Sequence, residues 1–535
     1  MIELTGEALT ISEVARVAHD REEVCLGRGV ADRVHGAHQR VTAWGRDRRP
    51  MYGVNTGFGE MTHVAVPDRH MRTLQVNLLR GHAAGAGPPF PDPVVRAMLI
   101  ARMNALARGF SGVSPATLQL MVHMLNSGIH PVIREQGSLG ASGDLAPLSQ
   151  MALPLIGEGD VTVAGERMTA SRALEAHGLK PVVLGFKEGL ALINGTSAMT
   201  GAGAIALLDA YSVAEVSILL SGVTIECLRG STAAYEPRGH ELRGHRGQML
   251  VARRLRELLA ESRLTRRHAE LMTAIEARSA GDDVVDTGIY IQNAYTLRCV
   301  PQILGPVIDT LAFCRGIIEQ ELNSCNDNPL ILDTADASFH GGNFHGQYVA
   351  MACDYLAIAL TEVGVLAERQ LNRLVDPATN GDLPAFLALE DSGLACGFMG
   401  AQYLATSIAS ENLDLAAPSS VKSIPSNGQN QDVVSMGLNA ARRCLRLGAN
   451  VSVILGVLGG ACHQAAHILG PELLGDAGRE WFALLGRMVE VHDESAPIGP
   501  LLERSRAFHQ TGAGAELARR RVALLDEAAH PARPS

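Results

Sequence analysis

Apolar residues recur at helical spacing over unusually long windows in the middle of the chain. In residues 345–375 they surround nearly the whole first half of the segment, proline is absent, and charged residues gather towards the end. This pattern predicts a helix of about 30 residues that is buried among other helices. Residues 200–222, 299–322 and 433–466 have the same character. Because Pro301 and Pro306 fall early in the second of these segments, its helix is expected to begin near Gly305.

The N-terminal part has a different pattern. Glycine- and proline-rich pieces at 84–93 and 127–140 separate short helical segments, as in a site built from loops. We therefore predict a mainly α fold, with a loop-rich N-terminal active-site domain (1–200), a central elongated bundle of long helices (201–485) and a C-terminal helical segment (486–535). The last ten residues, which are polar and proline-containing, are expected to be frayed.

Charge and cysteine content narrow the class of protein. The 535 residues carry a formal net charge of −10, and no basic run with interleaved aromatic residues occurs, which argues against a nucleic-acid partner. The nine cysteines are odd in number and scattered, so we expect core thiols rather than disulfides or a metal site. The first residues lack the layout of a signal peptide, and no uninterrupted apolar run has the length of a membrane span. A cytoplasmic protein without a membrane partner is expected.

One stretch, 138-SLGASGDLAPLSQMALPLIGEG-159, raises a chemical question. Its glycines would suit an ordinary turn, with Asp144 as the N-cap of a helix that starts at Leu145. Alternatively, the backbone nitrogen of Gly143 could close a five-membered ring on the carbonyl carbon of Ala141. Loss of two waters, one of them from the side chain of Ser142, would then leave a methylidene-imidazolone (MIO). This electrophile would replace an external cofactor, since no ordinary side chain is electrophilic.

Several further segments occur together with this stretch, in a fixed order along the chain. They are 52-YGVNTGFGEM-61, 75-QVNLLRGHAAGAG-87, 186-FKEGLALINGTSAMTG-201, 290-YIQNAYTLRCVPQILG-305, 323-NSCNDNPLI-331, 341-GGNFHGQ-347, 367-AERQLNRL-374 and 425-PSNGQNQDVVSMG-437. With these motifs the chain resembles the MIO-dependent aromatic amino-acid ammonia-lyases and 2,3-aminomutases from about residue 5 to about residue 500. Among them it looks closest to the bacterial tyrosine 2,3-aminomutases.

The resemblance implies an architecture and a set of roles. The fold would be that of fumarase and histidine ammonia-lyase, in a homotetramer whose active sites combine loops of three chains. Tyr52 matches the family's base for the β-proton, although a phenol of ordinary pKa about 10 needs a site that lowers that pKa. The catalytic residues implied are Tyr52, Ala141, Ser142, Gly143, Asn194, Tyr295 and Arg298, with Arg298 on the substrate carboxylate. The substrate-binding residues implied are Gly59, His82, Gln292, Phe344, Tyr403 and Gln431.

Four positions bear on the substrate's ring. His82 matches the position that reads the ring, but histidine also occurs there in histidine lyases. Gln431 stands where histidine lyases have glutamate, and Tyr403 resembles the tyrosine aminomutases. Hydrogen-bonding groups of His82 and Tyr403 at the ring end favour a substrate with a phenol over one with a plain phenyl ring. Gly81 departs from the serine expected in relatives and leaves room beside the ring, so an altered tyrosine such as an aza-tyrosine stays open.

The outcome of the reaction is less determined than its chemistry. A lyase releases ammonia and p-coumarate, whereas an aminomutase keeps its site closed and returns the amine to the β-carbon, so loop opening separates the two. We expect formation of a β-amino acid in natural-product (antibiotic) biosynthesis, with tyrosine ammonia-lyase and, more remotely, histidine ammonia-lyase as alternatives. An enzyme of the fumarase and aspartase type would need a Met-Pro-x-Lys-x-Asn core, which the sequence lacks. A helical scaffold without catalysis would need neither Ser142 nor Tyr52.

Overall fold

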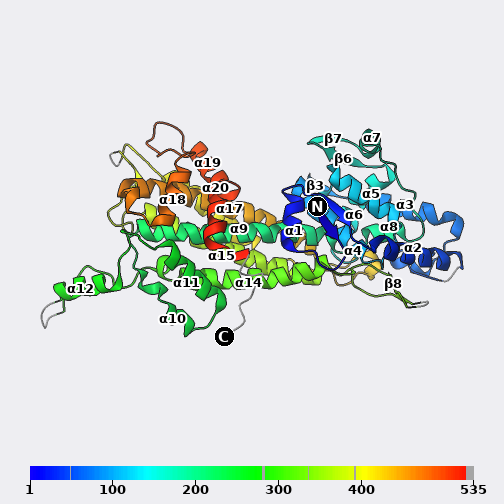
Figure 1. Ribbon diagram of the computed structural model, residues 1–535, viewed down its shortest axis with the longest axis horizontal. Helices are drawn as coiled ribbons and strands as arrows, with labels where there is room; N and C mark the ends of the chain where they lie inside the picture. The colour runs from blue at the N-terminus through cyan, green and yellow to red at the C-terminus, as the bar shows by residue number, and fades with distance from the viewer. Residues whose placement is uncertain (48–49, 280–283, 335–336, 391–392, 526–535) are drawn as a thin grey trace. The chain divides into compact units, whose positions relative to one another are not determined.

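The computed structural model describes residues 1–47, 50–279, 284–334, 337–390 and 393–525. The expected frayed tail, 526–535, lies outside these residues. Helices dominate, which confirms the predicted mainly α class (Figure 1). The chain forms two compact units, the first comprising 1–208, 313–355 and 418–445, and the second 209–312, 356–417 and 446–535. The division expected from the sequence, with boundaries at residues 200 and 485, stays a prediction.

Four long helices contain residues of both units: α9 (Ser197–Cys227), α14 (Val300–Leu322), α15 (Gln347–Val375) and α17 (Gly437–Leu469). The predicted long helices are confirmed, but the expected start of α14 near Gly305 is wrong. Pro301 lies in the first helical turn, where a backbone N–H has no partner, and Pro306 is accommodated inside the helix. The apolar residues Val300 and Leu304 before it are fully buried, and their packing keeps this first turn helical.

Three of these helices, α9, α15 and α17, have the length and apolar composition of membrane spans. Yet 83%, 72% and 72% of their most apolar windows are buried inside the protein. Their hydrophobic surface is thus covered by other parts of the chain, as expected for central helices of a large core.

The first unit combines short helices with small strands. Its helices are α1 (Ile11–Ala18), α2 (Val30–Arg46), α3 (Met71–His82), α4 (Asp92–Ala107), α5 (Pro115–Asn126), α6 (Leu145–Ala152), α7 (Ala170–Ala176) and α8 (Glu188–Ile193). Its strands are β1 (Ile2–Leu4), β2 (Val24–Leu26), β3 (Ala86–Pro89), β4 (Ile129–Pro131), β5 (Arg134–Gln136), β6 (Asp160–Val163), β7 (Glu166–Thr169), β8 (Leu330–Ile331) and β9 (Ser338–Phe339). The pairs β1–β2, β3–β5 and β8–β9 and the antiparallel order β4–β6–β7 make up its sheets, of which β1–β2 is parallel.

Helix α4 is the central element of the first unit. Its buried Arg96 donates to the carbonyl oxygens of Val17 (2.7 Å) and Leu125 (3.0 Å), which ties the ends of α1 and α5 to α4. A Cβ atom on Gly201 of α9 would lie 2.5 Å from the backbone nitrogen of Met98, so glycine is required where α9 crosses α4. These contacts provide the rigid base for the loops that follow.

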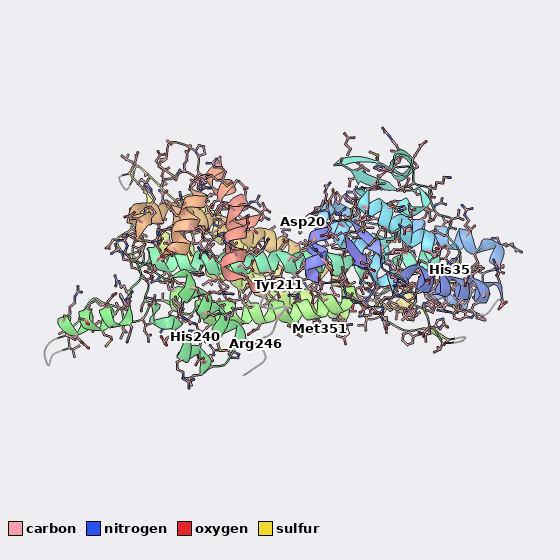
Figure 2. All side chains as sticks on the ribbon, viewed as in Figure 1. Asp20, His35, Tyr211, His240, Arg246 and Met351 are labelled. Carbon is pink, nitrogen blue, oxygen red and sulfur yellow. The ribbon has the colours of Figure 1, made fainter. Side chains whose placement is uncertain are left out.

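The second unit is helical and contains α10 (Pro237–Glu241), α11 (Arg246–Leu258), α12 (His268–Arg278), α13 (Tyr295–Arg298), α16 (Met399–Leu415), α18 (Asp476–Leu485), α19 (Gly499–Gln510) and α20 (Ala513–Val522). His240 and Arg246 mark α10 and α11 in Figure 2. Helices α18 and α19 meet at the fully buried Trp481, whose indole N–H donates to Nε2 of His509 at 3.0 Å. Burial lowers the pKa of His509 to about 4, so this imidazole is neutral at pH 7.

Candidate active site

A cavity of about 510 Å³ lies in the first unit, between α3, α6, α8 and three loops. Six of the residues expected at the site line it together: Tyr52, Gly59, His82, Ser142, Asn194 and Gln431. These residues come from five separate segments between positions 52 and 431. The fold therefore collects in one place side chains that are far apart in the sequence.

The loop that carries Ser142 is held by close backbone contacts. Gly143 adopts a left-handed conformation (φ 72°), and a Cβ atom there would lie 2.1 Å from the carbonyl oxygen of Gly195. The next backbone N–H, that of Asp144, donates to this same oxygen at 2.7 Å. Only glycine fits at position 143, and the loop is pressed against the turn that follows α8.

Asp144 takes the predicted N-cap position, because α6 begins at Leu145. Its carboxylate does not cap the helix, however. It accepts from the hydroxyl of Ser138 and from the backbone N–H of Met199, both at 2.7 Å. Complete burial raises the pKa of Asp144 to about 6, although these hydrogen bonds act in the opposite direction. The side chain thus fastens both flanks of the Ser142 loop.

Two amide side chains contact Ser142. Nε2 of Gln431 donates to its hydroxyl oxygen at 2.7 Å, and Nδ2 of Asn194 donates to its carbonyl oxygen at 3.0 Å. The hydroxyl of Ser426 donates to Oε1 of Gln431 at 3.0 Å, which orients that amide. Oδ1 of Asn194 is buried and has no hydrogen-bond partner among the described residues. A buried acceptor on the cavity wall is suited to a donor group of a ligand.

The loop that carries Gln431 is tightly folded. The backbones of Ser426 and Gln431 bond each other in both directions, and the intervening Asn427, Gly428 and Gln429 all have positive φ. Asn427 also lines the cavity, where a Cβ atom on Gly59 would clash with its side chain. Sequence reasoning missed Asn427, although it lies within the quoted segment 425–437.

Tyr52 is half-buried, and its hydroxyl oxygen accepts from the backbone N–H of Gly59 at 3.3 Å. Burial raises the pKa of the Tyr52 phenol, and the charge of Asp327 adds to the rise, while the Gly59 N–H opposes it. The expected lowering of this pKa is therefore not supplied by the described residues of one chain. The edge of the Tyr52 ring meets Phe58, with ring centroids 6.2 Å apart.

His82 lies at the last position of α3, and its Nδ1 bonds the carbonyl oxygen of Leu78 at 2.9 Å. A carbonyl oxygen only accepts, so Nδ1 carries the proton and Nε2 of the neutral ring is an acceptor. The preceding Gly81 also lines the cavity, and a Cβ atom there would meet nothing within 4 Å. This part of the cavity has space that a side chain at position 81 could fill.

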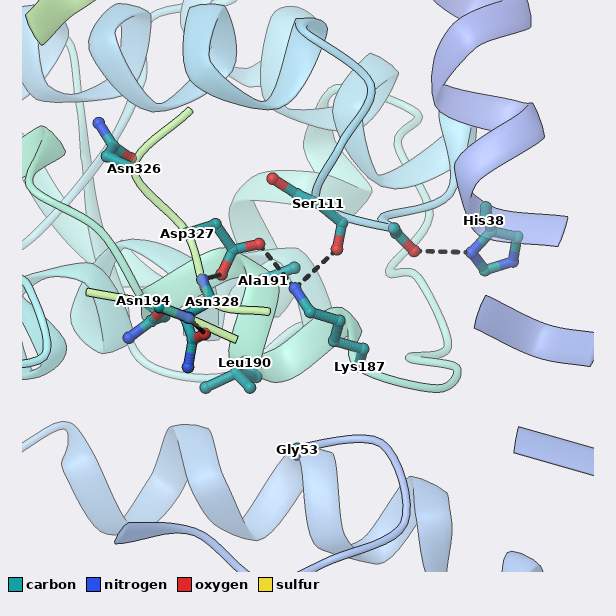
Figure 3. Close-up of polar contacts among 12 residues, drawn as sticks. His38, Gly53, Ser111, Lys187, Leu190, Ala191, Asn194, Asn326, Asp327 and Asn328 are labelled. Carbon is teal, nitrogen blue, oxygen red and sulfur yellow. Dashed lines mark hydrogen bonds and ion pairs between the residues drawn. The ribbon is translucent and has the colours of Figure 1, made fainter. Parts of the chain in front are cut away.

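A buried ion pair stabilises the position of α8. Nζ of Lys187 contacts the Asp327 carboxylate at 2.6 Å and donates to the carbonyl oxygen of Ser111 at 2.8 Å (Figure 3). Arg102, also fully buried, donates to Asn326 and to the carbonyl oxygen of Ala191 within α8. Because each charge has partners, the pair fixes α8 and with it Asn194.

The remaining expected residues lie outside this cavity wall. Phe344 is half-buried in the segment before α15, where the N–H of Gly346 donates to the carbonyl oxygen of Gly140 at 3.3 Å. Gln292, Tyr295, Arg298 and Tyr403 belong to the second unit.

The first three of these second-unit residues form a small cluster. Nη1 of Arg298 donates to Oε1 of Gln292, and its guanidinium lies over the ring of Tyr295, 4.8 Å from the centroid. Tyr295 is 67% exposed, and Tyr403 on α16 is 65% exposed. No group of three or more His, Cys, Asp or Glu residues that could hold a metal ion occurs in the described part of the chain.

The chain is mainly helical, and one serine is held in a glycine-rich loop at the wall of a cavity with polar side chains. This combination is typical of enzymes that act on small molecules. Residues 9–486 match the family model described as aromatic amino acid lyase. The chain is 58% identical to tyrosine 2,3-aminomutase of Chondromyces crocatus, over 95% of this chain and 96% of that protein. It is 45% identical to tyrosine ammonia-lyase of Cupriavidus metallidurans, over 96% and 99% respectively.

The crystal structure of tyrosine aminomutase from Streptomyces globisporus is also similar. It matches with a TM-score of 0.94 and 41% identity, over 97% of this chain and 98% of that one. The chain therefore belongs to the aromatic amino acid lyase family and is an enzyme of the aminomutase and ammonia-lyase type.

Proposed function

We propose that this enzyme is an MIO-dependent 2,3-aminomutase that converts L-tyrosine, or a close analogue, to the β-amino acid in natural-product biosynthesis. The observation that carries the proposal is the common cavity of Tyr52, Ser142, Asn194 and His82. With Tyr52 as the base for a carbon acid, Ser142 in a compressed loop, the free buried acceptor of Asn194 and His82 as the reader of a phenol, the cavity would suit one amino acid, which supports the proposal.

The residues around Ser142 fit an MIO formed from Ala141, Ser142 and Gly143. Gly143 has no room for a Cβ atom, its flanking groups are fixed, and Asn194 donates to the carbonyl oxygen of Ser142, which would remain as the exocyclic oxygen of the imidazolone. When formed, this group supplies an electrophile that makes the substrate amine a better leaving group. Gln431 and Asn194 would hold it in place.

Side chains that match the family's motifs then bind the substrate and act on its reacting atoms. Tyr52, at the cavity wall, takes the β-proton as general base. Arg298 binds the carboxylate, for which a guanidinium fork is the best protein partner, and Gln292 and Tyr295 orient that arginine. The unpartnered Oδ1 of Asn194 accepts from the substrate ammonium.

At the ring end, the acceptor Nε2 of His82 selects a donor on the substrate. A phenol O–H supplies such a donor, whereas phenylalanine would leave the histidine unpaired. Exchange of His82 for leucine is therefore expected to lower kcat/KM for tyrosine about tenfold relative to phenylalanine. Competition between the two substrates in one reaction measures this ratio directly, and an unchanged ratio would assign the phenol to another group.

We also propose a homotetramer in which Gln292, Tyr295, Arg298 and Tyr403 of one copy complete the cavities of others. The exposure of Tyr295 and Tyr403 supports this proposal. The nine cysteines are free, which supports a cytoplasmic location.

The shared site has a direct test. Co-expression of Ser142→Ala chains with Arg298→Ala chains should restore about a quarter of wild-type activity if each site needs both residues from different copies. Neither variant alone should turn over tyrosine. Mixed oligomers without recovered activity would place Ser142 and Arg298 of the same chain in one site.

A second candidate is a tyrosine ammonia-lyase, favoured by the 45% identity to the Cupriavidus enzyme. Incubation of the purified protein with L-tyrosine, followed by separation of the products by liquid chromatography and mass spectrometry, distinguishes the two. β-Tyrosine as the main product supports the aminomutase, whereas p-coumarate with free ammonia shows a lyase. Phenylalanine and histidine run in parallel test the ring, and turnover of histidine alone would contradict both candidates.

A further inference from the structure

Gln75 is a fully buried residue of α3 that lies outside the set of expected site residues. Both ends of its side-chain amide bond backbone groups of other segments. Nε2 donates to the carbonyl oxygen of Gly53 at 3.0 Å, and Oε1 accepts from the backbone N–H of Leu190 at 3.1 Å. A carbonyl only accepts and an N–H only donates, so these partners fix the orientation of the amide.

The three segments joined at Gln75 each bring a group to the cavity. Gly53 directly follows Tyr52, Leu190 belongs to α8, which ends one residue before Asn194, and α3 ends at His82. Three expected site residues, Tyr52, Asn194 and His82, thus lie on or next to three segments that the side chain of Gln75 joins by hydrogen bonds. The side chain of Gln75 bonds the backbones of Gly53 and Leu190 rather than these three groups, so its action is through the backbone.

The atoms around Gln75 are tightly packed. Gly53 is left-handed (φ 68°), and a Cβ atom there would lie 2.1 Å from Cδ2 of Leu190. A Cβ atom on Gly189 would lie 2.7 Å from the carbonyl oxygen of Gln75. Figure 3 shows Gly53 on its loop opposite Leu190 on α8. The Tyr52 loop therefore meets α8 at contact distance, in the place where the Gln75 hydrogen bond holds it.

Further along, the same loop is held mainly by its own bonds. The N–H of Gly57 donates to the carbonyl of Val64, and the N–H of Val66 to the carbonyl of Asn55, both at 2.9 Å. Met61, at the far side, is 59% exposed. Loss of the bond from Gln75 would let the beginning of the loop separate from α3 and leave the Gly53 carbonyl buried without this donor.

We propose that Gln75 is a positioning residue that holds the Tyr52 loop against α3 and α8, and thereby sets how much substrate ends as β-amino acid rather than as released unsaturated acid. This inference rests on the proposed aminomutase function. Return of the amine to the β-carbon requires the acid to stay in the cavity, so loop opening competes with the second half of the reaction. Loss of a buried hydrogen bond favours the open loop about tenfold.

Two variants separate the bonds. Gln75→Met has similar length and makes neither hydrogen bond, whereas Gln75→Glu keeps an acceptor for Leu190 and loses the donor to Gly53. The measured quantity is the ratio of p-coumarate to β-tyrosine formed from L-tyrosine. Because it is a ratio within one sample, it does not depend on the fraction of folded enzyme. Both variants are expected to raise it about tenfold, and the intact mass of each should still fall short of its own sequence mass by the two waters lost in MIO formation.

Gln464→Met is the matched control. Gln464 is also a buried helix glutamine, whose Nε2 donates to the carbonyl oxygens of Leu387 (3.1 Å) and His492 (2.9 Å) in the second unit. Its exchange should cost similar stability and leave the product ratio as in the wild type. If wild-type enzyme makes β-tyrosine and both Gln75 variants keep its ratio, or if Gln464→Met shifts it equally, the positioning role is wrong.

The two proposals can fail separately. If the wild type releases only p-coumarate, the aminomutase function is wrong, and the role of Gln75 is then judged from the pH dependence of kcat/KM. A base displaced from its position changes that profile in the Gln75 variants and not in Gln464→Met. A profile identical to that of the wild type would overturn the inference.

Discussion

The surroundings of Ser142 and those of Arg298 are built in opposite ways. Ser142 is bonded by Gln431 and Asn194, which are themselves fixed by a folded loop and by the braced helix α8. Arg298 has Gln292 and the ring of Tyr295 as neighbours, and that ring is 67% exposed. In the proposed site, the chain thus completes by itself the surroundings of Ser142, where the ring would close, whereas the cluster proposed to bind the carboxylate includes an exposed tyrosine ring. Compression of the backbone at Ser142 requires rigid surroundings, whereas a guanidinium needs only a carboxylate that approaches it to form an ion pair.

The largest effect on activity is expected from a substitution in the Ser142 region alone. Ser142→Ala should fold and lose activity by about a thousandfold or more, because no alkene can form without the serine hydroxyl. The wild-type intact mass should be lower than the sequence mass by about 36 Da, the mass of two waters, and the variant should lack the loss of the serine's water. Ser149→Ala, a buried serine of α6 away from the cavity wall, is the control. Retained turnover in Ser142→Ala would remove the serine from the chemistry.

Tyr52→Phe tests the base without touching the loop of Ser142. Turnover should fall by about 10²- to 10⁴-fold while the mass loss persists. Since burial raises the pKa of the Tyr52 phenol, its basic form is favoured by alkaline pH, and kcat/KM of the wild type should rise with pH on that side. The rise should disappear in Tyr52→Phe and persist in Tyr348→Phe, whose ring is 74% exposed. The same rise in Tyr52→Phe would show that another group is the base.

Acid should affect the second unit through His509. Burial lowers its pKa to about 4, below the ordinary 6.5, so the stability that depends on its neutral form is present above pH 6.5 and is lost as pH falls towards 4. The loss should reach about 3 kcal/mol. Trp44→Phe leaves Trp481, the partner of His509, as the single tryptophan reporter of urea unfolding. Adding His509→Leu should flatten the pH dependence, and an equally steep curve would assign it elsewhere.

The smallest effect concerns the free space at Gly81. Gly81→Ala should stabilise the protein by about 0.5–1 kcal/mol, since alanine suits a helix better and its Cβ meets nothing within 4 Å. The added methyl group narrows the ring end of the cavity. Turnover of tyrosine should change less than about threefold, whereas that of tyrosines substituted beside the hydroxyl should fall further. Equal effects on both substrates would show that position 81 does not face the ring.

The sequence predicted the long helices well, because apolar residues nearly all round a helix leave burial as the stable solution. It failed at the start of α14, where tertiary packing outweighs the two prolines. Within the site, motifs indicated roles for Tyr52, Ser142 and Gln431, but not for Asn427 or Gln75, although both lie in the quoted segments. Those two act through a loop conformation and through backbone bonds, which the residue types alone do not reveal.

The sequence alone determined the helical class, the Ala141-Ser142-Gly143 tripeptide and the set of polar residues that the family pattern requires. Only the tertiary structure decided which of them share a cavity, which tautomer of His82 faces it, and which groups remain on an exposed surface of the second unit. The reason is physical: residue types fix which chemistry is possible, whereas hydrogen-bond partners and burial exist only between segments that folding brings together.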